Sequence, residues 1–154
     1  MFNWSLASVP VPAITHPAPD HWRGSASNGS HIITSSTNWR SDSRGFDNFE
    51  WLRDLRAFGG SHARSRARQL IEGWVQHNSS WHASRWQPDI IGQRLANLIF
   101  CFDWYAPSAT EDFQAKLAQS IALQAKCLAL DWQRLIDQTA QLTALKGLFV
   151  AQAA

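Results

Sequence analysis

Two tryptophans, two arginines, a histidine and an asparagine in the middle of the chain have the types and spacing needed to bind an acidic sugar. The planar guanidinium of arginine binds a carboxylate or sulfate through two parallel hydrogen bonds. A neighbouring indole offers a flat apolar face to the C–H side of a sugar ring. We therefore expect a ligand-binding group made of Trp81, His82, Arg85, Trp86, Arg94 and Asn97.

The same residues also have a structural interpretation. Arg94 could pair with Asp89 or Asp103, and the two tryptophans could simply close a helical hairpin. The spacing leaves both interpretations open. Further upstream, the charged residues of an otherwise apolar helix are expected to reach neighbouring helices, because adjacent positions cannot pair along one helix face: these are Arg53, Asp54 and Arg56.

The sequence shows no pattern typical of a metal site, a phosphate-binding loop or a serine nucleophile. The six histidines are scattered, and none has a metal-ligand spacing with a carboxylate or thiol. No glycine-rich phosphate loop and no Gly-x-Ser-x-Gly element occurs. Neither a metal ion nor another cofactor is therefore expected. Cys101 and Cys127 fall inside predicted helices, where buried free thiols are favoured over a disulfide or a metal pair.

Composition predicts one globular domain without a membrane span. The chain has 154 residues, of which 45% are apolar and 17% charged, and it has nine tryptophans. No window approaches the roughly 18 consecutive apolar residues of a transmembrane helix. Residues 1–19 lack the basic and apolar regions of a secretory signal, and the compartment stays open. The net charge of +2 does not favour nucleic acid.

One helix carries a basic ridge that could bind phosphate. Arg64 and Arg68 lie one helical turn apart, with Arg66 between them, and such a ridge could meet phosphates. No recognition-helix motif accompanies it, and acidic residues nearly balance the basic ones. A solvated helix face is therefore the favoured interpretation, and no nucleic-acid partner is expected.

Periodicity divides the chain into an arm and a helical body. Residues 1–45 are rich in Pro, Ser and Gly, which predicts an irregular arm held to the body by Trp4, Trp22 and Trp39. Residues 46–154 carry helical apolar stripes and no strand pattern, so the predicted fold class is all-α, built from antiparallel helical hairpins. The expected helices are Asp47–Phe58, one capped by Ser61, one from Pro88 that ends before Pro107, one opened by the capping box Ser108–Glu111 and extending to about Leu135, and Leu142–Gln152.

Three separated motifs occur in an order that resembles a known protein family. They are Trp51-Leu52-Arg53-Asp54-Leu55-Arg56-Ala57, Trp86-Gln87-Pro88-Asp89 and Gly92-Gln93-Arg94-Leu95. In this order they resemble the N-terminal helical region of bacterial heparinase II/III-like proteins. The resemblance implies part of an incomplete (α/α) toroid, followed in similar proteins by a large β-sheet domain. It further implies β-elimination of uronic-acid polysaccharides, in which a base removes the C5 proton and an acid protonates the leaving oxygen.

The chain departs from that family at its catalytic motif. Active members resemble one another in an Asn-Asn-His motif before a helix that registers on Lys146-Gly147-Leu148 here. Gln138, Thr139 and Ala140 then occupy the motif positions, and the methyl group of Ala140 cannot move a proton. The last helix reaches Ala154 without a glycine or proline stop, so we expect the toroid and the β-sheet domain to continue beyond it. Tyr105, the single tyrosine, lies at the end of a predicted helix, and we do not expect it to be a catalytic group.

Two functional hypotheses follow. The first is the N-terminal segment of a heparinase II/III-like polysaccharide lyase, which contributes to a cleft for an acidic, uronate-containing polysaccharide and is not catalytic alone. The alternative is a non-enzymatic helical protein-interaction module. Both expect exposed apolar helix faces, because helices that are apolar on two sides pack on both.

Overall fold

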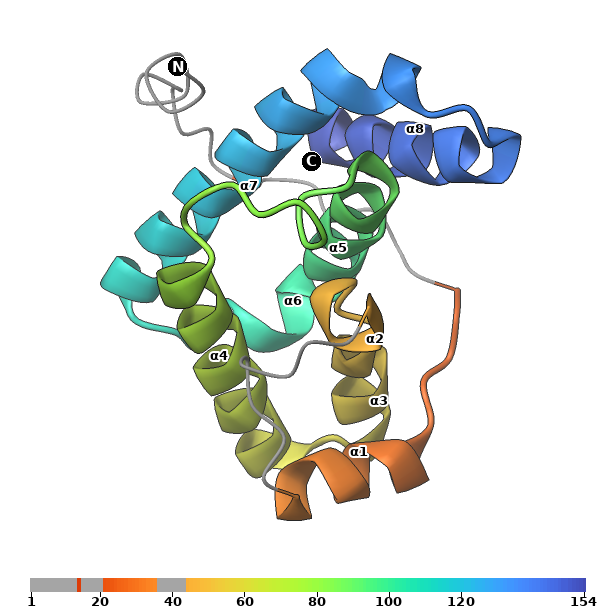
Figure 1. Cartoon of the computed structure of the whole chain (residues 1–154). Helices are drawn as coiled ribbons and strands as arrows, with labels where there is room; N and C mark the ends of the chain where they lie inside the picture. The colour runs from red at the N-terminus through yellow and green to blue at the C-terminus, as the bar shows by residue number, and fades with distance from the viewer. Residues whose placement is uncertain (1–13, 15–20, 36–43) are drawn as a thin grey trace.

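The computed structural model describes residue 14 and residues 21–35 and 44–154, and it confirms the all-α class. Over these ranges the chain forms helices and loops without a β-strand (Figure 1). None of the described helices is both long and apolar enough to cross a lipid bilayer. The elements are α1 (Ala26–Thr34), α2 (Arg44–Asp47), α3 (Trp51–Phe58), α4 (Gly60–His77), α5 (Pro88–Phe100), α6 (Phe102–Tyr105), α7 (Glu111–Asp131), the 3-10 helix η1 (Trp132–Arg134) and α8 (Gln138–Ala153).

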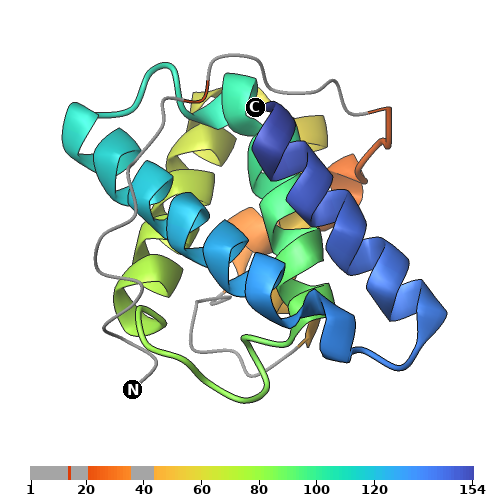
Figure 2. The same cartoon turned by 90° about the horizontal axis from the view of Figure 1, so that it is seen from above.

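Helix α5 is the centre of the fold. It contacts α2, α3, α6, α7 and α8, and Figure 2 shows α7 and α8 lying across it. Nearly every side chain from Ile90 to Ile99 is buried, as expected for a helix enclosed on all sides. Pro88 starts the helix at a position where its missing N–H removes no helical hydrogen bond. The sequence predicted this start correctly.

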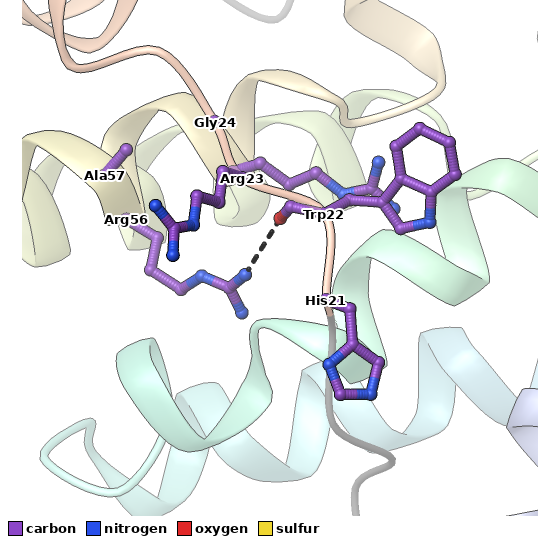
Figure 3. A pocket seen from close by; sticks show the side chains of 7 residues that line it. His21, Trp22, Arg23, Gly24, Arg56 and Ala57 are labelled. Carbon is purple, nitrogen blue, oxygen red and sulfur yellow. Dashed lines mark hydrogen bonds between the residues drawn. The ribbon is translucent and has the colours of Figure 1, made fainter.

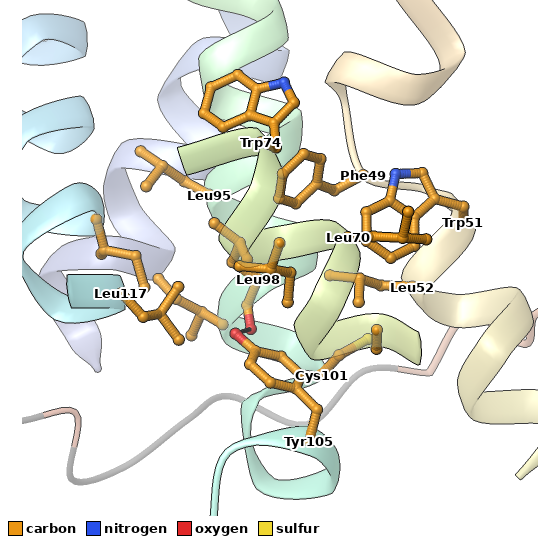
Figure 4. Close-up of a cluster of buried hydrophobic side chains, with 14 of the residues drawn as sticks. Phe49, Trp51, Leu52, Leu70, Trp74, Leu95, Leu98, Cys101, Tyr105 and Leu117 are labelled. Atoms are coloured by element: carbon orange, nitrogen blue, oxygen red, sulfur yellow. Dashed lines mark hydrogen bonds between the residues drawn. The ribbon is translucent and has the colours of Figure 1, made fainter. Parts of the chain in front are cut away.

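The core is an aromatic and aliphatic cluster between α3, α4, α5 and α7 (Figure 4). The ring of Phe49 packs against Trp51, with centroids 5.1 Å apart, and against the edge of Trp74 at 5.3 Å. Cys101 and Cys127 are both buried and free, which confirms the thiol interpretation. Burial raises the pKa of Cys127 to about 11, so its thiol stays protonated at neutral pH.

Two glycines bring α5 and α8 into backbone contact. A Cβ atom added at Gly147 would lie 2.2 Å from the carbonyl oxygen of Gly92 and 2.3 Å from its Cα. A Cβ atom at Gly92 would lie 2.6 Å from the carbonyl oxygen of Thr143. Real Cβ atoms do not approach backbone this closely, so side chains at these positions would push the helices apart. This contact sets which residues of α5 and α8 face one another.

The helix predicted over Asp47–Phe58 begins later in the structure, after a turn. Helix α2 ends at Asp47, α3 begins at Trp51, and Phe49 between them has a φ of +62°. A positive φ costs a residue other than glycine about 1–3 kcal/mol. Full burial of the Phe49 ring between Trp51 and Trp74 offsets that cost. Periodicity could not reveal this turn, because the apolar pattern continues through it.

Helix ends also differ from the sequence prediction. Helix α4 begins at Gly60, after Gly59 and Gly60 both take φ near +80°, so Ser61 lies inside it rather than capping it. Thr110 caps α7 by accepting from the N–H of Phe113, two residues later than a cap at Ser108. Asp137 caps α8 by accepting from Ala140 N–H, which starts that helix four residues earlier than predicted.

The described part of residues 1–45 is more regular than predicted. Helix α1 lies within the segment interpreted as an irregular arm, and it packs on α3. Ser25 caps it by accepting from the N–H of Asn28, a local signal masked by the surrounding Ser, Asn and Gly residues. Trp22 does not pin the segment through its ring, which is 67% exposed. Trp4 and Trp39 lie outside the described residues.

The glycine contact predicts a large and position-specific effect of one methyl group. Gly147→Ala should lower the free energy of unfolding by about 3 kcal/mol, because the added carbon overlaps the backbone of Gly92. Urea denaturation measures the change. Gly45→Ala is the control, since no atom lies within 4 Å of its added Cβ, and it should shift stability by less than about 0.5 kcal/mol. Equal losses in both variants would contradict the contact.

Candidate anion-binding pocket

Arg94 lies in the interior rather than at a surface. Its side chain is 0% exposed, and its Nε donates to Gln124 Oε1 at 2.6 Å. Its Nη1 donates to the carbonyl oxygen of Asp47 at 2.7 Å, and both Nη atoms donate to the carbonyl oxygen of Arg85 at 3.1 Å. Its Cζ stands 4.1 Å from the ring centroid of Trp74, a cation–π contact. The guanidinium therefore joins four distant parts of the chain.

A carboxylate accompanies this buried arginine. Asp47 accepts a hydrogen bond from Trp74 Nε1 at 2.8 Å, and its Oδ1 lies 3.6 Å from Nε of the half-buried Arg85. Burial lowers the pKa of Arg94 to about 9, and the negative charge of Asp47 opposes that shift. Arg94 therefore remains charged at neutral pH. Its role in this geometry is to hold the helices together.

The structure does not bring the six candidate residues to one open surface. Trp86 and Asn97 are buried along with Arg94, whereas Trp81 is 54% exposed and His82 is exposed. Asn97 Nδ2 donates to the carbonyl oxygen of Asn48 at 2.8 Å. Spacing placed these residues on one stretch of chain but could not predict which of them face inward.

Arg94 also uses partners other than those considered from the sequence. Gln124 and two backbone carbonyls accept its hydrogen bonds, instead of the carboxylates of Asp89 or Asp103. Gln124 lies 30 positions away, on α7. Helical spacing cannot predict a partner at that separation, because it relates only residues three or four positions apart.

Two further candidates have structural roles. Arg68 donates to the carbonyl oxygens of Tyr105 at 2.7 Å and Ser108 at 3.0 Å, so the ridge considered for phosphate binding ties α4 to the segment before α7. Tyr105 is fully buried, and its hydroxyl donates to the carbonyl oxygen of Leu98 at 3.0 Å. Burial raises the pKa of Tyr105 well above its usual value, so the phenol cannot serve as a base.

The basic surface of the described structure lies elsewhere. A pocket of about 470 Å³ opens between the segment before α1 and one face of α3 (Figure 3). Three of its lining residues are arginines, one is a histidine and one is the exposed Trp22, and none is acidic. The lining residues are His21, Trp22, Arg23, Gly24, Arg53, Arg56 and Ala57.

Backbone contacts hold the two walls of this pocket together. Arg56 Nη2 donates to the carbonyl oxygen of Trp22 at 3.5 Å, and its Nη1 donates to that of Phe100 at 3.0 Å. Asp54 Oδ1 accepts from the N–H of Ser25 at 2.7 Å. These bonds agree with the prediction that Asp54 and Arg56 reach other parts of the fold. These bonds hold the segment His21–Arg23 beside α3.

Gly24 makes this arrangement feasible. A Cβ atom at Gly24 would lie 2.1 Å from the carbonyl oxygen of Arg53, so only glycine lets the segment approach α3 this closely. With the backbone in contact, the two side chains that precede Gly24, Trp22 and Arg23, border the same pocket as Arg53 and Arg56. A site lined by one sign of charge attracts counter-ions. The pocket suits a carboxylate or sulfate next to an apolar ring face.

Sequence reasoning missed this pocket as a binding site. It assigned Trp22 to pinning the arm and Arg53 and Arg56 to an internal network. The signal available was the run His21-Trp22-Arg23, an aromatic residue between two basic ones. The run alone does not predict a pocket, because the arginines of α3 that complete the lining come about thirty positions later in the sequence.

Comparison of the chain with family models, with curated proteins and with solved structures gave no match. Among the residues that the structure describes, no group of three or more His, Cys, Asp or Glu side chains is arranged to hold a metal ion. The function is therefore argued from the chemistry of the Trp22 pocket and from the sequence motifs.

Arg94 should behave as a structural residue. Arg94→Ala should lower the free energy of unfolding by about 3–5 kcal/mol, because it leaves Gln124 and two buried carbonyls without their donor. Thermal and urea denaturation measure this loss. Gln124→Ala removes one of those bonds and should cost about 1–3 kcal/mol, which keeps the test informative if Arg94→Ala does not fold. The control Arg134→Ala, with a side chain 80% exposed, should change stability little. An Arg94→Ala protein of unchanged stability would refute the structural role.

Proposed function

We propose that the chain binds acidic, uronate-containing polysaccharide, as the N-terminal helical segment of a heparinase II/III-like polysaccharide lyase. The observation that carries this proposal is the Trp22 pocket, which combines three arginines, a histidine and an exposed indole without an acidic lining residue. The order of the Trp51–Ala57, Trp86–Asp89 and Gly92–Leu95 motifs supports the family assignment. In this proposal the helices form part of an incomplete (α/α) toroid.

The pocket offers separate groups for the two parts of a uronate. A guanidinium binds the carboxylate in a planar fork, and Arg23 is the exposed arginine of the pocket best placed to meet an incoming ligand. The face of Trp22 accepts the C–H side of the ring, an apolar surface that stacking removes from water. A purely cationic ridge without an aromatic side chain would bind charge alone. The combination favours a charged sugar over a simple anion.

The role proposed for this chain is binding rather than cleavage. Gln138, Thr139 and Ala140 form the first turn of α8, where the resemblance would place the catalytic Asn-Asn-His motif. Ala140 has no group that neutralises a carboxylate or transfers a proton. The phenol of Tyr105 is buried and bonded to a backbone carbonyl. Proton transfer in a lyase parent would then depend on residues outside this chain.

Removing one positive charge from the Trp22 pocket should lower its affinity for an acidic glycan. Arg23→Gln should reduce the affinity for an alginate tetrasaccharide about fivefold, the usual effect of one partly exposed ion pair. Isothermal titration calorimetry at low salt measures it, because salt screens such pairs. Arg134→Gln makes the same charge change on the exposed η1 and should leave affinity unchanged. No binding by the wild type, or equal binding of a single-stranded oligonucleotide of matched charge, would refute the glycan assignment.

One observation favours the alternative of a non-enzymatic protein-interaction module. Helix α8 packs on α5 through Ala144 and Gly147, and it exposes a second apolar face, with Phe149 72% exposed. Leu142, Leu145 and Phe149 are spaced three and four positions apart and so share that face. A helix that is apolar on two sides normally packs on both.

The alternative makes a different prediction. If α8 is an interaction surface, the purified chain should self-associate at micromolar concentration, and the double variant Leu142→Ser/Phe149→Ser should sediment as a monomer. Sedimentation velocity measures the difference. The same variant should keep the affinity for the tetrasaccharide, because neither residue lines the Trp22 pocket. A wild type that stays monomeric up to high concentration would argue against the module.

A further inference from the structure

A second polar pocket lies next to the first. It has a volume of about 120 Å³ and is formed by the start of α3, the middle of α5 and the middle of α8. Arg53 lines both pockets, so they meet at this one side chain. Its lining residues are Glu50, Arg53, Gln93, Ala96, Asn97, Thr143 and Lys146.

Asn97 has an unused acceptor at this pocket. Its side chain is 2% exposed, and its Oδ1 is buried without a hydrogen-bond partner among the described residues. Its Nδ2 donates to the carbonyl oxygen of Asn48, so exchanging the amide nitrogen and oxygen would place two acceptors against each other. The orientation of the amide is therefore fixed. A buried acceptor without a donor is unfavourable, and a hydroxyl group supplies the missing donor.

The other lining residues suit the rest of a sugar acid. Lys146 lies over the ring of Phe100, with Nζ 5.4 Å from the ring centroid, which places its charge beside α5. Lys146 and Arg53 are cations that bind a carboxylate, while the Gln93 amide and the Thr143 hydroxyl can each donate to or accept from a sugar hydroxyl. The exposed Glu50 carboxylate adds an acceptor for sugar hydroxyls. The pocket thus offers both hydrogen-bond donors and acceptors, unlike the Trp22 pocket, whose charged lining residues are all basic.

We propose that the Asn97 pocket binds a second unit of the same acidic oligosaccharide, with a sugar hydroxyl donating to Asn97 Oδ1 and the carboxylate facing Lys146. This inference rests on the proposed function, because it takes the ligand class from the Trp22 pocket. Arg53 stands at the junction and meets the glycan between the two units. The close contact of Gly92 with Gly147 brings Gln93 and Lys146 to opposite walls of the pocket.

The experiment compares variants of the two pockets on one ligand. Lys146→Gln and Gln93→Ala should each reduce the affinity for an alginate tetrasaccharide about fivefold or more, since each removes one polar contact to a charged or hydroxylated group. Lys126→Gln is the matched control, because it makes the same charge change on α7 and lines neither pocket. Free glucuronate, which cannot span both pockets, should bind more weakly than the tetrasaccharide.

A direct readout at Asn97 separates this site from a general charge effect. In 1H–15N spectra of the wild type, the side-chain amide signals of Asn97 should shift when the tetrasaccharide is added, because a new donor meets its Oδ1. The shift should persist at higher ligand concentration in Arg23→Gln, which alters only the first pocket. It should be reduced in Gln93→Ala.

The outcomes distinguish the two proposals. If the wild type does not bind the tetrasaccharide, the proposed function and this inference both fail. If Arg23→Gln weakens binding while Lys146→Gln and Gln93→Ala behave like Lys126→Gln, and the Asn97 signals do not move, only this inference fails. Equal competition by an oligonucleotide of matched charge would overturn the assignment of the pocket to a sugar.

Discussion

Arg94 carries a positive charge into the interior of the helical body, and much of the surrounding geometry follows from keeping that charge satisfied. A buried guanidinium loses its hydration, which is costly unless each donor finds an acceptor. Gln124, the carbonyl oxygens of Asp47 and Arg85 and the face of Trp74 supply these contacts. They come from α7, the last residue of α2, the loop before α5, and α4. Without any one of these elements, the buried guanidinium would lose an acceptor or its aromatic contact.

The turn after α2 links this charge to the second pocket. Because Phe49 takes a positive φ, the chain leaves the helical path, and the carbonyl oxygens of Asp47 and Asn48 accept from Arg94 and Asn97, one turn apart on α5. A continuous helix through this turn would use those carbonyls for its own hydrogen bonds. The fixed Asn97 amide, and with it the unused acceptor, is therefore a consequence of the backbone strain at Phe49.

Close backbone contacts place both pockets. Gly24 lets the segment before α1 touch α3, and Gly92 and Gly147 let α5 and α8 touch each other. In each case the absence of a Cβ atom lets the backbones of two elements come into contact. The polar residues that flank the contact then border a common space. The two spaces meet at Arg53, which is half-buried on α3.

The all-α class and most of the main helices can be predicted from the sequence, because apolar periodicity, Pro88 and the capping residues act within a few positions of one another. The sequence by itself did not determine which charged residues are buried. Arg94 and Arg53 occur in similar apolar helices, yet Arg94 is fully buried, with acceptors up to 47 positions away, whereas Arg53 is half-buried and lines two pockets. The candidate pocket depends on the same kind of distant contact, since Trp22 becomes part of a site only beside α3. Local patterns encode elements, whereas burial and shared pockets arise from packing between segments that the sequence keeps far apart.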